Sequence, residues 1–370
     1  MTEAFVVNSG SSSIKWELLD VESEQVTAHG IVERIGEPGG VADHAAGMRE
    51  ILGDLGDEHP AVIGHRVVHG GSRFTAATLV TDEVEQAIDE LSALAPLHNP
   101  ANLAGIRAAR AAFPAVPNVA VFDTAFHQTL APEAYTYAID RAVAAEHGVR
   151  RYGFHGTSYH YVAGATADLL GLPLGSLKLI VFHLGNGASV CAIDGGRSVD
   201  TSMGMTPLEG LVMGTRSGDL DPGLLFHLGR AATSLPELDT LLNRHSGLLG
   251  LTGMRDMRDV QAAAASGDAD ARLALGVYTH RLRHYLGAYL AHLGGADAIV
   301  FTAGVGENSA ATRAATLAGM QWLGIDVDAE RNVSAERGAR VVSSDGSAIT
   351  VLVVPTNEEL EIARQAVALL

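Results

Sequence analysis

The sequence predicts an α/β protein built from two duplicated domains, and three observations support this prediction. Short apolar runs with the length of strands alternate with longer segments of helical periodicity, which is typical of layered α/β architecture. The stretches VVNSGSSSIKWELLD and VFHLGNGASVCAIDGG, one in each half, share a plan of apolar strand, polar residue, small-residue turn and returning strand. The chain has 370 residues, which suits two domains of ordinary size. We therefore expect two similar halves that face one another, although hairpins with glycine turns are common by themselves.

The elements of the first half follow from the apolar pattern and its interruptions. The expected elements are two strands within residues 6–20, a surface helix and loop within 40–60, a strand at 61–68, helices at 81–94 and 102–113, and a buried strand at 119–122. The helix at 81–94 opens with Thr-Asp-Glu-Val, which supplies a cap and an acidic first turn. The second helix is closed by Pro114.

The second half repeats this pattern. The expected elements are strands at 179–184 and 190–193 around a turn at 185–189, long helices of which 269–293 is the clearest, a strand at 298–302 followed by a glycine-rich loop, a strand at 351–354 and a closing helix at 357–370. Thr356 and Glu359 have the spacing of a capping box at the start of that last helix. Glu359 would then be structural, and Glu358 would be free for another role.

Composition excludes several classes of function. The 25 basic and 43 acidic side chains give a net charge of −18, which argues against a nucleic-acid or anionic-membrane partner but not against a small anionic ligand. The single cysteine, Cys191, rules out an intrachain disulfide and suits a reducing compartment. The opening MTEAFVVN does not resemble a secretory signal, and no run reaches the roughly 20 apolar residues of a membrane span. We expect a cytoplasmic protein.

Three glycine-rich turns follow apolar strands and are candidate phosphate- or nucleotide-binding sites. The first is NSGSSSIK, with Ser11, Ser13 and Lys15, the second is HLGNGAS, and the third is TAGVGENS. In such turns backbone N–H groups converge without obstruction by Cβ, hydroxyls add donors, and a lysine adds positive charge. For the first stretch alone, a plain hairpin turn is the alternative. None of the three has the Rossmann G-x-G-x-x-G spacing, and the chain contains no P-loop.

Polar residues within apolar surroundings form a second group of candidates. They are Arg66, His98, Asp123, His127, His155 and Arg216, the last in a loop that also carries Asp219 and Asp221. Each of them alone has a structural explanation, because an arginine can pair with any carboxylate and a histidine can pack while donating to a backbone carbonyl. His65 and His69 lie four residues apart, but the apolar strand before them and the glycines after them argue against a helical zinc site.

Taken in order, nine stretches resemble the motifs of the acetate kinase family. They are NSGSSSIK, GHRVVHGG, LAPLHNP, VFDTAFHQ, YGFHGTS, HLGNGASV, MGTRSGDLDPG, TAGVGENS and PTNEEL. The resemblance runs from Val6 to Arg364, and chance agreement of nine motifs in the same order is negligible.

The resemblance implies a fold, a reaction and an assembly. The fold would be of the sugar kinase–actin–chaperone (ASKHA) type, with two duplicated ribonuclease H-like α/β domains and an interdomain cleft that closes to exclude water. The N-terminal domain would comprise residues 1–126 and 360–370, and the C-terminal domain residues 127–359. The reaction would be reversible transfer of the γ-phosphoryl group of ATP to acetate, giving acetyl phosphate and ADP. It would require Mg²⁺, for which Mn²⁺ could substitute, and the protein would be a homodimer.

The resemblance also assigns site residues by position. The catalytic residues would be Arg66, Asp123, His155 and Arg216. The acetate site would consist of Arg66, Val68, Leu97, His98, Phe154 and Pro207. The nucleotide site would consist of Ser11, Ser13, Lys15, His183, Leu184, Gly185, Asn186, Gly187, Asp256, Met257, Arg258, Gly304, Val305, Gly306, Glu307 and Asn308. The magnesium site would contain Asn8 and Glu358.

This sequence departs from the family pattern at two places. The segment between Trp16 and Ala61 is shorter than is usual for the family, which should trim the periphery of the first domain and leave the cleft intact. Tyr159 stands where the family commonly has the second histidine of HGTSH, so any role of that histidine is in doubt here.

The chemistry of the implied reaction agrees with these residue types. Phosphoryl transfer asks the protein mainly for positioning and charge stabilisation, and acetate is already ionised at neutral pH, so it needs no general base. Arg66, Arg216 and His155 would neutralise the phosphoryl group, and Asp123 would orient an arginine or a magnesium-bound water. The alternatives are a propionate or butyrate kinase, a phosphatase or polyphosphatase on the same fold, and a nucleotide sensor without turnover.

Overall fold

The structure is a computed structural model that describes residues 2–10, 12–55 and 60–370, and it divides into two compact units. The first unit comprises residues 1–128, Phe154–Tyr161 and Asn357–Leu370, and the second comprises Thr129–Gly153 and Val162–Thr356. The chain therefore leaves the first unit twice and returns to it twice. Among the described residues, no helix is both long and apolar enough to cross a membrane.

The first unit is built on a six-stranded sheet of order β3-β2-β1-β4-β6-β5. The strands are β1 (Glu3–Ser9), β2 (Ser13–Asp20), β3 (Gln25–Glu33), β4 (Val62–Val67), β5 (Thr78–Leu79) and β6 (Asn118–Phe122). The first three form an antiparallel meander, whereas β1, β4 and β6 are parallel and β5 is an antiparallel edge strand. Because the carboxyl ends of parallel strands meet at one edge, Asn8, Arg66 and Asp123 are brought to the same edge of this sheet.

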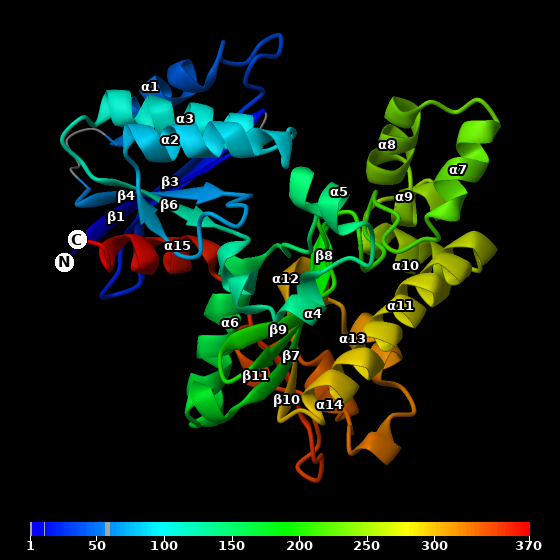
Figure 1. Ribbon diagram of the computed structural model, residues 1–370. Helices are drawn as coiled ribbons and strands as arrows, with labels where there is room; N and C mark the ends of the chain where they lie inside the picture. Colours follow the sequence, from blue (N-terminus) through cyan, green and yellow to red (C-terminus); the bar gives the residue numbers. More distant parts are fainter. Residues whose placement is uncertain (1, 11, 56–59) are drawn as a thin grey trace. The chain divides into compact units, whose positions relative to one another are not determined.

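Helices cover both faces of the first sheet, as Figure 1 shows. They are α1 (His44–Leu55), α2 (Asp82–Glu90), the 3₁₀ turn η1 (Leu91–Ala93) and α3 (Asn99–Ala112) on one side, and α15 (Glu358–Val367) on the other. Side chains alternate along β1, so that Phe5 and Val7 pack in the core with α1 and α3, whereas Ala4 and Val6 pack in the core with α15. A Cβ at Gly64 would lie 2.7 Å from a carbon of α15, so glycine permits this helix to pack closely on β4.

The start of α15 differs from the prediction. The N-cap is Asn357, whose side-chain oxygen accepts a hydrogen bond of 2.9 Å from Leu360 N. Glu359 forms an ion pair with Lys15 instead of completing a capping box with Thr356. The predicted capping box is therefore wrong, because the helix begins one residue later, after a residue that caps more strongly than threonine. Glu358 is the first residue of the helix.

The second unit contains a sheet of order β11-β12-β10-β7-β8-β9. Its strands are β7 (Lys178–Leu184), β8 (Ala188–Asp194), β9 (Arg197–Thr201), β10 (Ala298–Thr302), β11 (Arg340–Val341) and β12 (Thr350–Val353). Strands β7, β8 and β9 form an antiparallel meander, β7, β10 and β12 are parallel, and β11 is an antiparallel edge strand. Read from the meander, β9-β8-β7-β10-β12-β11 matches β3-β2-β1-β4-β6-β5 strand for strand. This topology confirms the predicted α/β fold with duplicated halves.

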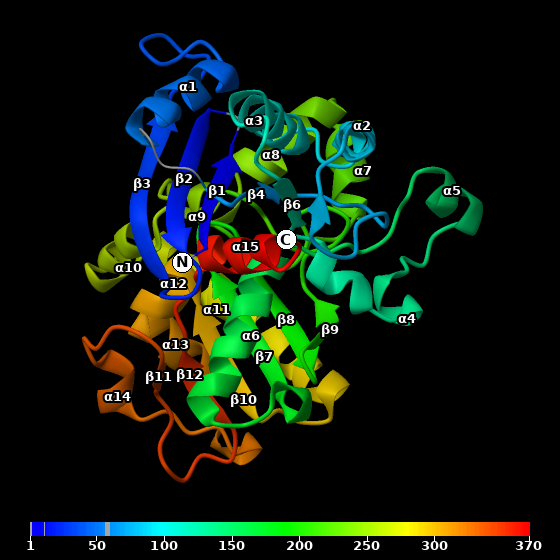
Figure 2. The same ribbon diagram turned by 90° about the vertical axis from the view of Figure 1, so that its left-hand side faces the viewer.

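The helices of the second unit are more numerous than those of the first. They are α4 (Pro132–Tyr135), α5 (Arg141–Glu146), η3 (Leu174–Ser176), α7 (Gly223–Arg230), α8 (Leu235–Arg244), α9 (Gly247–Thr252), α10 (Met257–Ala265), α11 (Ala269–Leu293), α12 (Ala303–Asn308), α13 (Ala310–Leu317), η4 (Gln321–Leu323) and α14 (Ala329–Val333). The helix α6 (Gly156–Leu170) begins in the first unit and ends in the second, and the 3₁₀ turn η2 (Ala125–Thr129) lies where the chain first passes between them. Figures 1 and 2 show α6 and α11 on opposite faces of the second sheet.

Local signals account for the best-predicted elements. The helix predicted at 269–293 and the strand predicted at 298–302 have these same bounds in the structure. Asp268 caps α11 at one end, and Gly294, with φ of 67°, ends it in the left-handed conformation. The stretch after β10, predicted as a glycine-rich loop, is instead the short helix α12, so that part of the prediction is wrong. Its glycines cost helix propensity but do not prevent a helix of six residues.

Candidate functional site

The first unit holds an arginine–aspartate pair where β4 and β6 end, with the aspartate buried and the arginine partly buried. Arg66 Nη2 lies 2.6 Å from Asp123 Oδ2, and Arg66 Nε donates to both carboxylate oxygens at 3.1 and 3.2 Å. Asp123 is 2% exposed and the Arg66 side chain is 24% exposed, so the carboxylate is shielded from water while the guanidinium group keeps an accessible part. Burial disfavours the charge of Arg66, but Asp123 and then Glu358 outweigh it and raise the pKa of Arg66. The pair therefore fixes a permanent positive charge in one orientation.

The two residues predicted to bind magnesium lie around this arginine. Arg66 Nη1 is 3.5 Å from the amide oxygen of Asn8, and Glu358 interacts electrostatically with Arg66 and Asp123. Burial, together with the negative charge of Asp123, raises the pKa of Glu358 to about 7. A cation placed beside Glu358 would therefore favour its charged form.

The turn after β4, which carries Val68, is held by two asparagines of α3. Asn102 accepts a hydrogen bond from Val68 N at 3.1 Å and donates to Ser9 O at 2.6 Å, so it ties the ends of β4 and β1 together. Asn99 accepts from His69 N and donates to His69 O. Sequence reasoning missed both asparagines, although they occur in the HNPAN stretch beside the predicted acetate site.

The apolar residues predicted to hold the acetate methyl differ in exposure. Val68 is 5% and Phe154 is 3% exposed, whereas Leu97 is 53% exposed. His98, at the N-cap position of α3, is partly buried, and Pro207 belongs to the second unit. Val68 and Phe154 are therefore part of the packed first unit, while Leu97 has a free surface.

His155 is positioned by direct contact between α6 and the end of β6. It has φ of 59°, which is uncommon for a residue other than glycine. The next residue, Gly156, donates from its N–H to Asp123 O at 2.9 Å, and a Cβ there would lie 2.3 Å from that oxygen. Thr157 Oγ1 adds a bond of 3.3 Å to Asp123 Oδ1. The backbone around His155 thus adopts a strained conformation that the Asp123 contacts maintain.

The remaining histidines of these motifs have structural contacts. His127 is buried, with Nε2 2.9 Å from Phe154 O. His65 is buried beside Asn118, with 2.7 Å between His65 Nε2 and the amide oxygen, and burial lowers the pKa of His65 to about 4. In the described part of the chain, no group of three or more His, Cys, Asp or Glu residues could hold a metal ion.

The second unit contains a cavity of about 590 Å³ on the side of the glycine-rich segments. The predicted nucleotide residues that line it are Gly185, Asn186, Asp256, Met257, Arg258, Gly304, Val305 and Asn308. Nothing lies within 4 Å of a Cβ built on Gly304, so glycine leaves the wall of the cavity open there. A volume of this size lies within the range of small-molecule sites.

Not every predicted nucleotide residue lines the cavity. His183, Leu184, Gly187, Gly306 and Glu307 lie on the same segments but are not among its lining residues. Ser13 and Lys15 belong to the first unit, and Ser11 lies outside the described residues. The lining residues that sequence reasoning missed are Gly214, Leu248, Arg255, Gln261, Tyr278 and Ser309. Gly214 lies two residues before Arg216 in the stretch MGTRSGDLDPG, so this motif could have identified Gly214 as a site residue.

Arg216 lies in the second unit, in a long segment without helix or strand. Its Nη1 is 3.3 Å from Pro207 O and 3.7 Å from the sulfur of Met213. Burial lowers the pKa of Arg216, and within the described ranges no carboxylate forms an ion pair with it. This guanidinium group therefore carries a charge that a bound anion could neutralise.

A duplicated α/β fold with a fixed guanidinium group in one unit and a cavity with glycine-rich walls in the other suits a phosphotransferase that uses a nucleotide. The model of the acetokinase family matches residues 37–364, and the chain belongs to this family. The predicted family and the predicted enzyme class are confirmed.

Relatives and solved structures agree with this assignment over the whole chain. An acetate kinase from Leifsonia xyli subsp. xyli is 64% identical and covers 99% of this chain and 98% of the relative. One from Clavibacter michiganensis subsp. michiganensis is 59% identical, with coverage of 100% and 99%. The crystal structure of Porphyromonas gingivalis acetate kinase is similar with a TM-score of 0.96 at 40% identity, covering 100% of this chain and 99% of that one. A propionate kinase structure from Francisella tularensis has a TM-score of 0.94 at 38% identity, covering 100% of both chains.

Proposed function

We propose that this chain transfers the γ-phosphoryl group of ATP reversibly to acetate by direct in-line transfer, with Arg66, His155 and Arg216 as catalytic residues and Asp123 as the residue that positions Arg66. The observation that carries this proposal is the two-point contact between Arg66 and the buried Asp123, where a guanidinium group is held in one orientation. Binding of a nucleotide alone would not require such a group outside the nucleotide cavity.

The chemistry needs charge neutralisation more than proton transfer. Acetate is ionised at neutral pH, so its oxygen attacks the γ-phosphorus without a general base. The reaction brings this anion to a triphosphate, and the repulsion must be offset by fixed cations. Arg66 and Arg216 offer planar donors to the oxygens of the transferred phosphoryl group, and His155 adds a third donor.

Asn8 and Glu358 fit a magnesium ion by the chemistry of their donor atoms. Both offer oxygen, which Mg²⁺ prefers, and a site with one carboxylate suits an ion that keeps most of its water shell. Burial raises the pKa of Glu358, so a cation beside it would stabilise the charged form of this carboxylate. When bound with ATP, the ion would neutralise phosphate charge, and Mn²⁺ would have the same role.

The nucleotide would occupy the cavity of the second unit. Gly185, Asn186, Gly304 and Asn308 line it with backbone and amide groups, and Arg258 adds a cation. Ser13 and Lys15 of the first turn would assist at the phosphates, although Lys15 is paired with Glu359 and Glu17.

Acetate is the acid we propose, and propionate is the second candidate because one similar structure is a propionate kinase. One methylene group in an apolar site discriminates by only about 1–3 kcal/mol, so activity with both acids is expected and acetate should be preferred.

A single assay tests the reaction and the acid. The protein is mixed with ATP, Mg²⁺, hydroxylamine and acetate, propionate or butyrate, and the acyl hydroxamate is measured. We expect most product with acetate, and a loss of turnover of about 10²–10³-fold in Arg66→Ala and in Arg216→Ala. Arg73→Ala is the matched control, because Arg73 is an exposed arginine on the same segment, paired with Glu90. Absence of product with all three acids would contradict the proposed function.

The magnesium residues are tested by titration of the metal. Glu358→Gln should raise the Mg²⁺ concentration needed for half-maximal rate by about tenfold, the equivalent of one lost charged contact. Glu359→Gln should leave it near the wild-type value. A requirement shifted by the second substitution and not by the first would reverse the assignment.

We further propose a cytoplasmic homodimer with no nucleic-acid or membrane partner. The net charge of −18 and the single, buried Cys191 support the location and the absence of these partners. The dimer rests on the family resemblance, and light scattering of the purified protein tests it directly, with a monomer mass of 38.5 kDa as the contradicting result.

A further inference from the structure

The segment from Ser202 to Pro222 contains neither helix nor strand, although it carries Pro207 and Arg216. An irregular segment of this length has few ladder hydrogen bonds to hold its shape, so other bonds must do so. We call residues 203–219 the arginine loop. Two carboxylates in it, Glu209 and Asp219, have no part in the reaction proposed above.

Asp219 closes the second half of the arginine loop. Its N–H donates to Gly210 O at 2.9 Å, and its Oδ1 accepts from Gly210 N at 2.8 Å, so the ten residues from Gly210 to Asp219 form a closed turn. Its other oxygen, Oδ2, accepts from Tyr285 Oη at 2.8 Å and lies 3.4 Å from Arg281 Nη1. The closed turn is therefore anchored to helix α11, and Arg216 lies within it.

Glycine is required where this turn closes. Gly218 has φ of 69°, and a Cβ there would lie 2.4 Å from Leu211 O and 2.6 Å from Gly210 O. Gly210 itself has φ of 108°. A residue larger than glycine at position 218 would therefore clash with the backbone where the Asp219 contacts close the turn.

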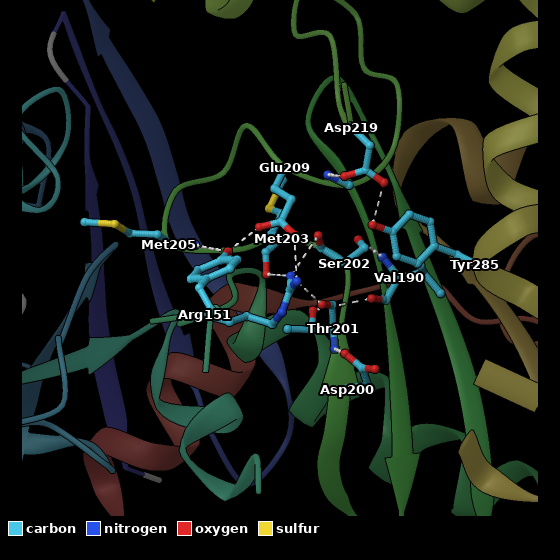
Figure 3. A network of polar contacts seen from close by, with 12 residues as sticks. Arg151, Val190, Asp200, Thr201, Ser202, Met203, Met205, Glu209, Asp219 and Tyr285 are labelled. Carbon is cyan, nitrogen blue, oxygen red and sulfur yellow. Dashed lines mark hydrogen bonds and ion pairs between the residues drawn. The ribbon is translucent and has the colours of Figure 1, made fainter. Parts of the chain in front are cut away.

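Glu209 fixes the first half of the arginine loop. Arg151 Nη2 donates to Glu209 Oε1 at 2.6 Å, while Arg151 Nη1 lies 3.0–3.3 Å from the carbonyl oxygens of three successive residues, Thr201, Ser202 and Met203. Tyr137 Oη donates to Glu209 Oε2 and accepts from Met205 N at 3.1 Å. Figure 3 shows these contacts around Arg151 and Glu209 together with the Asp219–Tyr285 bond.

The two halves meet at Arg216. Its Nη1 donates to Pro207 O, two residues before Glu209, and its backbone lies in the turn that Asp219 closes. We propose that Asp219 and Glu209 are positioning residues for Arg216: they hold an irregular loop in the one shape that presents this guanidinium group. The inference rests on the role of Arg216 in the proposed function.

A double-mutant cycle tests the inference. Asp219→Ala should lower kcat for hydroxamate formation by about 100-fold, since a misplacement of about 1 Å has an effect of this order. In an Arg216→Ala background the same substitution should change kcat by less than about threefold, because a residue that acts through Arg216 has nothing left to position. A general structural role would instead lower kcat equally in both backgrounds, and that result would overturn the inference.

Three further variants sharpen the test. Asp219→Asn should retain part of the activity, because its amide oxygen can still accept from Gly210 N, and it replaces Asp219→Ala in the cycle if that variant does not fold. Asp221→Asn is the matched control: Asp221 is exposed in the same segment, and its side chain accepts a hydrogen bond from Gly223 N, so kcat should stay within about threefold of wild type. Glu209→Gln should repeat the pattern of Asp219→Asn.

A crystal structure of Asp219→Ala decides the inference independently of activity. We expect the Arg216 guanidinium group to move by more than about 1 Å and to lose its contact with Pro207 O. An unmoved guanidinium group would overturn the inference. Failure of the proposed function has a different signature, namely no hydroxamate from the wild-type protein with any acid, and in that case the crystal structure alone decides.

Discussion

Replacing Asp123 by asparagine perturbs the site in the most limited way that the structure allows. The side chain keeps its size and one oxygen, and Thr157 keeps a possible acceptor. What changes is the contact with Arg66: Asp123 now accepts from Nε at 3.1 and 3.2 Å and from Nη2 at 2.6 Å, and asparagine would turn an N–H group toward one of these donors.

The contacts set the size of the expected effect. At least one charge-assisted hydrogen bond is lost, and such a bond is worth about 1.5–3 kcal/mol. If Arg66 is needed in its present orientation in the transition state, kcat falls by about 10- to 100-fold, because about 1.4 kcal/mol corresponds to a factor of ten. The KM for ATP should change little, since the nucleotide cavity belongs to the second unit.

The hydroxamate assay at saturating ATP and acetate measures this effect, and a thermal unfolding curve shows that the variant is folded under assay conditions. Asp89→Asn is the control, because it removes one carboxylate from an exposed pair with Arg107 in the same unit, where a pair contributes about 0–1 kcal/mol. If Asp123→Asn retains kcat within about threefold of wild type, the reasoning that Asp123 orients Arg66 is refuted.

Two further substitutions test other parts of the structure. Gly214→Ala should raise the KM for ATP by about tenfold without changing the KM for acetate, because a Cβ there would lie 2.2 Å from the Asn186 side chain at the nucleotide cavity. Gly229→Ala is the control and should change neither KM, because nothing lies within 4 Å of a Cβ built at that position. Equal KM values for ATP in the two variants would contradict the assignment of the cavity to the nucleotide. His160 bonds Glu361, which raises the pKa of His160, so the stabilisation by this pair is complete below about pH 6.5 and is lost as the pH rises through the raised pKa. His160→Gln should therefore lower Tm more at acidic than at alkaline pH, by no more than the equivalent of about 1 kcal/mol because the histidine is exposed, and a pH-independent difference would contradict this assignment.

The fold could be predicted from the sequence largely because its signals are local. Asp268 and Gly294 mark both ends of α11, and the apolar pattern of the two hairpins predicts strands that the structure confirms. The prediction failed where two local signals compete. Thr356 and Asn357 are adjacent, and both are of residue types that favour the N-cap position. The N-cap in the structure is Asn357, and only the path of the chain before α15 selects it over Thr356.

The residues of the candidate site could be assigned by motif, but the residues whose hydrogen bonds hold them in place could not. Nothing in the local sequence indicates that Asn102 links the ends of β1 and β4, because its partners are 34 and 93 residues away. The same holds for Glu209, whose partner Arg151 is 58 residues away. Long-range hydrogen bonds of this kind follow from the fold, so they become visible only when the chain is folded.

The most direct test of the account is a crystal structure of the protein with ADP, Mg²⁺, acetate and a planar fluoride analogue of the transferred phosphoryl group. The account predicts that guanidinium nitrogens of both Arg66 and Arg216 lie about 3 Å from the equatorial atoms of the analogue. Either guanidinium group lying more than about 6 Å away would contradict the claim that these two arginines neutralise the phosphoryl group during transfer.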